Sequence, residues 1–434
     1  MFVAVTNLGA GGTEDVSLAD TANGVLYGCF AIMGLFSGGV TNLLGVRLTL
    51  FLGSLGYALY IGSLWCFQTQ GTRWFVIFSG AILGISAALL WSAQGAIMMS
   101  YPLEKDKGKA FGIFWAIFQF GSFIGAVIAL AINIRHGGIS SVSTGTYLAF
   151  LVIVFIGAGS ATLLLPPASI IRADGSLVKV QTASSPREEL RSLIRLFMDW
   201  RMLALSPMFF VSNYAYAYQG AVNAFYFEGS TRAVNATLEG AGAIVGALIV
   251  GFGILDAPLL RRRTRGWLGL AFVTICVMAV WSCALAWQVT FTRASQIGKM
   301  SYRGDGYAPK GALYFFYYIS DAAYQALAYW IIGAITNDPF KLARYAGFFK
   351  AIQSAGSAGS FGMDAVATPF LNELLACWIM TLVSLPLAGV VVYHIHETSY
   401  QDEDTIFVGD TKSGDPETKV NTDIKEIQAT EDTA

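Results

Sequence analysis

Eleven separate stretches of about twenty mostly apolar residues run through this chain, and they limit its fold more than any other feature. A helix needs roughly 20 such residues to cross the hydrocarbon core of a bilayer. Backbone polar groups find no water inside lipid, so each stretch must satisfy them within its own helix. The predicted spans cover residues 21–41, 48–67, 74–100, 110–134, 147–165, 202–224, 237–255, 267–288, 312–336, 345–366 and 371–393.

The composition also favours a membrane protein. Hydrophobic residues make up 55% of the 434 residues and charged residues only 13%, which is about half the charged share of a soluble domain. The 47 glycines fit helices that pack closely in lipid. We therefore predict an all-α polytopic membrane protein with the lipid bilayer as its first partner.

Several other classes of function are disfavoured. The net charge is −1, and Lys and Arg occur in short blocks between the apolar stretches, which is not the pattern of a nucleic-acid-binding surface. No nucleophile–base pair is apparent at membrane depth, and no spacing of Cys and His suggests a metal site. The sequence therefore predicts no enzyme, no metal and no cofactor.

The spans fall into two groups separated by a long polar segment. Residues 1–165 hold five spans, residues 166–201 form a linker, and residues 202–393 hold six. The apolar start at 1–10 is too short to span and looks like the second half of a helix whose beginning is missing. When it is counted as a stump of the first helix, the stump and the eleven full spans make two six-helix halves. Residues 394–434 are predicted to be a disordered acidic tail.

The linker carries the signature of a helix. Ser185, Pro186 and Glu188 have the spacing of an N-cap, a first-turn proline and a capping-box glutamate. Apolar residues follow at helical spacing, with arginines on other faces. This pattern favours an amphipathic helix lying in the lipid headgroup layer; a plain solvated connector is the alternative.

The distribution of Lys and Arg predicts the orientation of the chain. Twenty of these residues fall in the loops and tail on the side of the linker, against seven on the other side. Cytosolic loops are enriched in Lys and Arg, so the linker and the C-terminus are predicted to be cytosolic. The count does not distinguish a plasma membrane from a vacuole.

Polar residues deep inside the spans are the candidate functional residues, because ionisable groups there are costly and often functional. Asp321 lies near the middle of span 312–336, and Lys350 lies about one turn inside span 345–366. Asp321 is either a coupling site or a structural acid bonded to tyrosines or to Lys350. A direct ion pair between the two is stretched, since their depths differ by roughly 9 Å. The candidates for binding a solute or ion are Asp321, Gln325, Gln94, Trp91, Asn213, Tyr216, Lys350 and Gln353.

Glycines recur with a three-helix period. When the stump is counted as the first helix, the spans richest in glycine are the second, fifth, eighth and eleventh. Examples are Gly34 and Gly38 in the second span and Gly242 and Gly246 in the eighth. Close glycine contacts allow helices to approach and slide. We predict that these four helices pack where the two halves meet.

The turn after span 21–41 resembles a known signature. Residues 38–47, GGVTNLLGVR, are similar to the gating loop of the major facilitator superfamily, with Gly38, Asn42, Gly45 and Arg47 at its marked positions. Asn42 stands where an Asp is commoner, and Leu43 replaces the usual basic residue. Further segments resemble the fungal Unc-ninety-three-like branch of that superfamily, namely 56–60 GYALY, 91–95 WSAQG, 100–102 SYP, 329–330 YW, 337–339 NDP, 343–345 ARY and 353–356 QSAG.

The resemblance implies a fold and two functions. In the superfamily, helices one, four, seven and ten face a central cavity, and the halves rock about it. The first function is a secondary transporter of a small solute or ion by alternating access, with Asp321 as the coupling site. The second is a non-transporting membrane subunit that regulates an ion channel or escorts a receptor, with another membrane protein as its partner.

Overall fold

The computed structural model describes residues 16–135, 144–165, 170–172, 178, 185–296 and 298–398, and their regular structure is helical. The predicted stump at 1–10 and almost all of the predicted tail at 394–434 lie outside the described residues. The N-terminal set consists of α2 (Val16–Leu44), α3 (Val46–Gln70), α4 (Arg73–Ser100), the short η2 (Glu104–Asp106), α5 (Lys107–Arg135), α6 (Thr144–Ser160) and η3 (Ala161–Leu163).

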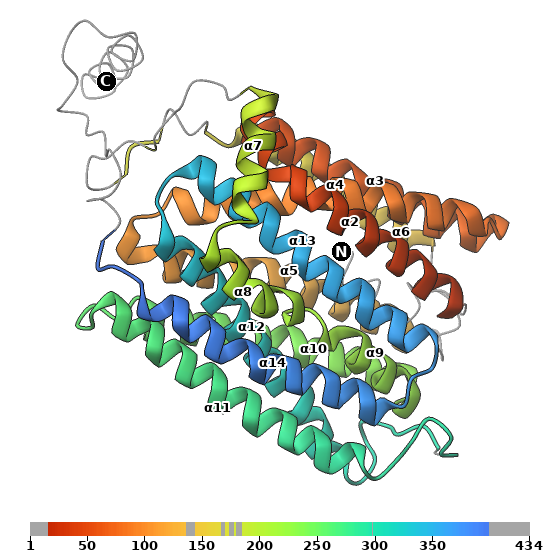
Figure 1. The fold of residues 1–434 in the computed structure, drawn as a ribbon. Coiled ribbons are helices and arrows are strands. Elements are labelled where there is room, and N and C mark those ends of the chain that lie inside the picture. Colours follow the sequence, from red (N-terminus) through yellow and green to blue (C-terminus); the bar gives the residue numbers. More distant parts are fainter. Residues whose placement is uncertain are drawn as a thin grey trace, which may run out of the picture.

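The linker helix α7 (Pro186–Leu196) leads into a second set of helices. This C-terminal set consists of α8 (Trp200–Val211), α9 (Ala215–Tyr226), α10 (Gly229–Leu248), the π-helical η5 (Ile249–Leu255), α11 (Arg262–Gln288), α12 (Tyr307–Ile335), α13 (Pro339–Ala365) and α14 (Phe370–Tyr393). Figure 1 shows the long helices side by side, with α7 lying across the end of α2. We call this end of the molecule the linker end and the opposite end the far end.

Each of the eleven predicted spans lies largely in helix, and two differ in detail: the helix of span 237–255 begins earlier, at Gly229, and segment 202–224 is not continuous. Segment 202–224 is two helices, α8 and α9, separated by a turn at Ser212–Tyr214. Pro207 lies inside α8 and cannot donate a backbone hydrogen bond. The Ser212 amide and hydroxyl both bond back to the Phe209 carbonyl, which tightens the last turn and ends α8.

Among the described residues, six helical segments have the length and apolar composition to cross a membrane: α2 from residue 21, α3, α4, α10 with η5, α11 and α14. Large apolar side chains project outward from several helices, and Ile32, Ile117 and Ile275 are each more than two-thirds exposed. Exposed apolar surface of this extent marks contact with an apolar partner. The architecture is that of a multi-pass helical protein surrounded by lipid.

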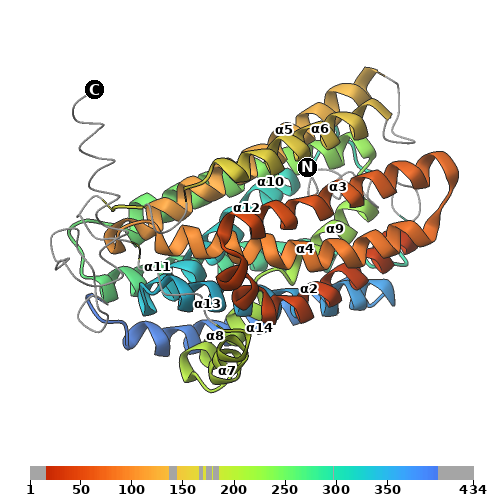
Figure 2. The ribbon, with the colours of Figure 1, turned by 90° about the horizontal axis from the view of Figure 1, so that it is seen from above.

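Two seams join the N-terminal set to the C-terminal set. Helix α2 packs against α13, and α5 packs against α10 and η5. A Cβ on Gly34 would lie 2.9 Å from the Ala351 Cα, and one on Gly112 would lie 2.9 Å from the Ala247 carbonyl oxygen. These four helices hold the predicted second, fifth, eighth and eleventh spans, so the expected packing of glycine-rich helices is confirmed. Figure 2 shows the two seams from above, with α5 and α10 on one side and α2 and α13 on the other.

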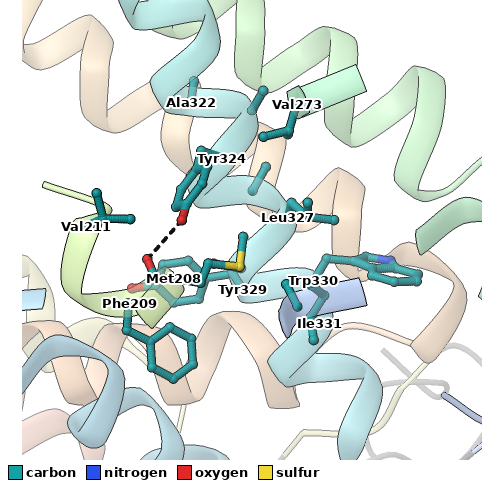
Figure 3. Close-up of a cluster of buried hydrophobic side chains, with 14 of the residues drawn as sticks. Met208, Phe209, Val211, Val273, Ala322, Tyr324, Leu327, Tyr329, Trp330 and Ile331 are labelled. Carbon is teal, nitrogen blue, oxygen red and sulfur yellow. Dashed lines mark hydrogen bonds between the residues drawn. The ribbon is translucent and has the colours of Figure 1, made fainter. Parts of the chain in front are cut away.

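The larger hydrophobic core lies within the C-terminal set and reaches into α4 and α5. Figure 3 shows part of it, where Tyr324 of α12 points at the end of α8 and its hydroxyl donates to the Met208 carbonyl at 3.2 Å. A smaller core holds α2, α3, α4 and α6 together. Helix α12 is therefore fixed along much of its length, which positions the polar residues it carries.

Candidate functional site

Seven of the eight candidate residues form one connected cluster. They come from α4, from the α8–α9 turn, and from α9, α12 and α13, so both sets of helices contribute. The members are Trp91 on α4, Asn213 in the turn, Tyr216 on α9, Asp321 and Gln325 on α12, and Lys350 and Gln353 on α13. A side-chain hydrogen bond from Gln325 to Asp321 links the two ends of the cluster.

Asp321 lies at one end of the cluster. The Tyr216 hydroxyl donates to its Oδ2 at 2.9 Å, and the Tyr216 ring stacks on Tyr318 with centroids 6.0 Å apart. Asp321 and Tyr216 also line a cavity of about 40 Å³ between α8, α9, α11, α12 and α14. A cavity of this size has room for a few water molecules. Asp321 therefore has both a hydrogen-bond donor and space for water beside it.

Two glutamines form the middle of the cluster, and both are fully buried. Gln325 donates through Nε2 to the Asn213 Oδ1 at 2.8 Å and to the Ser212 carbonyl at 3.1 Å. Gln353 donates through Nε2 to the Ser212 Oγ at 2.7 Å and to the Gln325 Oε1 at 3.2 Å. The break between α8 and α9 supplies the Ser212 carbonyl as a partner, because the backbone carbonyls of a continuous helix are occupied by its own hydrogen bonds. It also supplies the side chains of Ser212 and Asn213.

Lys350 lies at the other end. Its Nζ donates to the Gln353 Oε1 at 2.7 Å and lies 4.6 Å from the Trp91 ring centroid, with Phe349 and Tyr329 also within cation–π range. Among the described residues, no carboxylate lies within ion-pair distance of Lys350. The direct Asp321–Lys350 pair considered from the sequence does not form, and the side chains of Gln353 and Gln325 lie between the two charges.

Gln94 stands apart from the cluster. Both its amide oxygen and its amide nitrogen are buried, and neither has a hydrogen-bond partner within the described structure. It follows Trp91 by three residues on α4, and Trp91 Nε1 donates to the Tyr57 hydroxyl at 3.2 Å. Native structures rarely leave a buried amide unsatisfied. Within the described structure, Gln94 is therefore the predicted site residue whose amide oxygen and nitrogen are both unpaired.

The four predicted gating-loop residues divide between two roles. A Cβ on Gly38 would lie 2.6 Å from the Ala343 carbonyl oxygen, so Gly38 allows α2 to touch α13. Asn42 Nδ2 lies 3.3 Å from both carboxylate oxygens of Glu189. Gly45 adopts a φ of 77° before α3, and Arg47 donates to the Leu164 carbonyl within the N-terminal set. Of the four, Gly38 and Asn42 contact elements outside the N-terminal set.

A polar network closes the linker end of the seam between α5 and α10. Lys107 of α5 donates to the Gly333 carbonyl at 2.6 Å and to the Asn337 Oδ1 at 2.7 Å, and Arg262 pairs with Glu104 at 3.2 Å.

Asp256 adds to this closure at the start of α5. It follows η5 and accepts from the Lys109 backbone amide at 2.5 Å. Burial raises the pKa of Asp256 to about 6, while hydrogen bonds from the Lys109 and Gly108 amides oppose that rise. The linker end is therefore held shut by contacts between the two sets.

Sequence reasoning missed two acids, for different reasons. Glu239 lies near the start of predicted span 237–255, but α10 begins at Gly229, so Glu239 is well inside the helix and 6% exposed. Tyr318, the ring stacked on Tyr216, is hydrogen-bonded to Glu239. The rule that ionisable groups inside spans are functional candidates would have selected Glu239 had the boundary been placed correctly. The second acid is Glu189 of the linker helix α7, which pairs with Arg344 of α13.

This geometry defines a class of protein. Two sets of membrane helices, joined along two glycine-rich seams and enclosing a polar cluster built from both, form a major-facilitator-type membrane protein. Solved structures agree on the fold. The E. coli fucose:proton symporter matches with a TM-score of 0.59 at 13% identity, covering 90% of this chain and 95% of that one. The human organic anion transporter MFSD10 matches with a TM-score of 0.55 at 14% identity, covering 87% and 83%.

The sequence comparisons then narrow the class to a family. The family model described as "Ion channel regulatory protein UNC-93" matches residues 20–393. An UNC93-like protein of Schizosaccharomyces pombe is 39% identical over 402 residues, which cover 91% of this chain and 79% of that protein. UNC93-like protein 1 of Arabidopsis thaliana is 36% identical over 407 residues, covering 93% and 88%. The chain belongs to the UNC-93 family.

Proposed function

We propose that this protein is a secondary transporter that carries a small solute or ion by alternating access between its two sets of helices. The observation that supports the proposal is the polar cluster, whose hydrogen bonds run from Asp321 to Lys350 across the α8–α9 break. Such a cluster costs stability in a membrane protein, because buried charges must be desolvated. Its presence despite that cost supports a functional role. It also includes Trp91 of the N-terminal set, so relative movement of the sets would rearrange it.

Each part of the cluster has a role in this proposal. Asp321 takes up and releases the coupling proton or cation, with Tyr216 as its hydrogen-bond donor. Gln94, Asn213 and Gln325 bind the solute. Lys350 balances the charge of the occupied site, and Gln353 positions Lys350 by accepting its hydrogen bond. The linker and C-terminus face the cytosol, and the halves comprise residues 1–165 and 202–393.

Reconstitution into liposomes tests the proposal. Internal pH is recorded while a panel of cations and small solutes is offered outside, with wild type compared with Asp321→Asn. Asp305→Asn is the matched control, since Asp305 is an exposed acid outside the cluster. We expect solute-dependent pH change in wild type and in Asp305→Asn, and its loss in Asp321→Asn. Flux that persists in Asp321→Asn would make Asp321 a structural acid.

The family description supports a second candidate function. A regulatory subunit of an ion channel or an escort for another membrane protein would keep this fold without moving solute. Folded protein that gives no flux with any member of the panel would favour this candidate. Its test is purification of the full chain from native membranes in mild detergent, followed by identification of a stoichiometric membrane-protein partner.

A further inference from the structure

The linker helix α7 touches both sets of helices through one carboxylate. Arg344 of α13 donates to Glu189 through Nε and a terminal nitrogen, each at 2.8 Å, which is the bidentate geometry of a strong ion pair. Asn42 of α2 approaches the same carboxylate at 3.3 Å. Glu189 is 7% exposed, and a Cβ on Gly39 of α2 would lie 3.2 Å from its side chain. Glu189 thus joins the two sets at the α2–α13 seam.

Glu189 supplies the negative charge of this contact. Asn42 and Leu43 are uncharged and Arg47 bonds within the N-terminal set, so the loop itself forms no ion pair across the seam in the described structure. The acid is instead supplied by the linker, 147 residues along the chain from Asn42. On the other seam, Asp256 follows η5 directly and accepts from the start of α5. The acid that closes the α2–α13 seam therefore comes from the linker, whereas the acid at the α5–α10 seam comes from the C-terminal set.

The opposite face of α7 is exposed and carries two adjacent stripes. At about 100° per residue, Leu190 and Ile194 lie roughly 100° and 140° around the helix from Glu189, and they are 54% and 59% exposed. An arginine stripe lies beside them, formed by Arg187, Arg191 and Arg195, all exposed. Apolar side chains beside a row of cations are the arrangement of a helix lying in an anionic membrane surface.

The start of α7 is held by a capping box. Ser185 and Glu188 form a complete capping box, with the Ser185 Oγ accepting from the Glu188 amide and the Glu188 carboxylate accepting from the Ser185 amide. At its other end, Phe197 packs edge-on against Phe348 of α13 at 5.4 Å. The helix is therefore a defined element that faces the bundle on one side and the membrane surface on the other.

We propose that α7 is a clasp controlled by anionic phospholipid. The arginine and apolar stripes dock on anionic headgroups of the leaflet at the linker end. Docking orders α7, holds Glu189 on Arg344 and Asn42, and so favours the state in which the α2–α13 seam is closed. A neutral leaflet gives weaker docking and a looser seam.

The proposal is tested by hydrogen–deuterium exchange on the full chain in lipid nanodiscs. Discs of phosphatidylcholine alone are compared with discs of equal phosphatidylcholine and phosphatidylserine. In wild type we expect phosphatidylserine to slow amide exchange both in α7 and at the linker ends of α2 and α13. Each arginine near an anionic surface contributes about a fivefold effect on docking.

Two variants separate the two faces of α7, and a third is the control for removing three cations elsewhere. Arg187→Gln/Arg191→Gln/Arg195→Gln should abolish the lipid effect everywhere. Glu189→Gln should keep the lipid effect in α7 but lose it at α2 and α13. Removing three cations from the far end, by Arg73→Gln/Arg303→Gln/Lys310→Gln, should leave the wild-type response intact. Exchange in α12 reports whether each variant is folded.

Two results would overturn the clasp. One is exchange in α7 that is the same in both kinds of disc. The other is a lipid effect at α2 and α13 that survives Glu189→Gln. Neither measurement needs a solute, so the outcome is independent of whether the protein transports.

Discussion

At the scale of single residues, membrane depth made part of the site predictable. Asp321, Gln325 and Lys350 stand out in the sequence because polar groups are scarce within spans, and the structure brings them into one cluster. Glu189 could not be selected in this way. It lies in a charged linker among other charged residues, and its partner Arg344 is 155 residues away. Only the fold shows that this one carboxylate is buried and paired.

Replacing two buried glutamines, Gln94 and Gln353, should change the stability of the folded protein in opposite directions. Gln94 has no partner for either amide atom, whereas Gln353 bonds to Ser212, Gln325 and Lys350. An unsatisfied buried polar group costs about 1–3 kcal/mol. Without solute, Gln94→Leu should raise the free energy of unfolding by about that amount, and Gln353→Leu should lower it by a similar amount.

Thermal unfolding of the purified protein in detergent measures both changes, and each variant serves as the control for the other. A loss of stability in Gln94→Leu equal to that in Gln353→Leu would mean that the Gln94 amide is bonded. In the liposome assay, Gln94→Leu should reduce flux despite its greater stability.

At the scale of helices, the spans were predictable because hydrophobic length alone determines them. The break between α8 and α9 was not predictable in this way. The twelve residues of α8 and the twelve of α9 together have the length and hydropathy of one span. The signal for the break is Pro207 followed by Ser212 and Asn213. The tolerance of membrane helices for proline weakens that signal. The break matters because it provides the partners of both glutamines.

Two glycines on α2 test the seam. A Cβ on Gly38 would meet the Ala343 carbonyl oxygen and the Arg344 Cα at 2.6 Å, whereas one on Gly28 would meet nothing within 4 Å. Gly38→Ala should therefore destabilise the folded protein by roughly 1–3 kcal/mol. Gly28→Ala should be neutral or stabilising, by up to about 1 kcal/mol, because alanine favours helix. Thermal unfolding compares the two variants directly, and equal effects would show that α2 and α13 do not touch at Gly38.

At the scale of the whole molecule, the two sets of helices meet along seams whose linker ends are closed by Glu189, Asp256, Lys107 and Arg262. The glycine period in the sequence predicted which helices form the seams. It could not predict the polar contacts that close them, because those contacts join residues far apart in the chain. In the proposed function, the two sets move about the polar cluster and expose it to each side in turn.

The most direct test is the accessibility of position 216, which lies beside Asp321. Tyr216→Cys is introduced after replacing Cys29, Cys66, Cys276, Cys283 and Cys377, and the protein is reconstituted in liposomes of known orientation. A membrane-impermeant thiol reagent is then applied from one face or from the other. We expect labelling from both faces, slower from the linker end and accelerated there by Glu189→Gln. Labelling from a single face under all conditions would contradict alternating access and favour a static regulatory subunit.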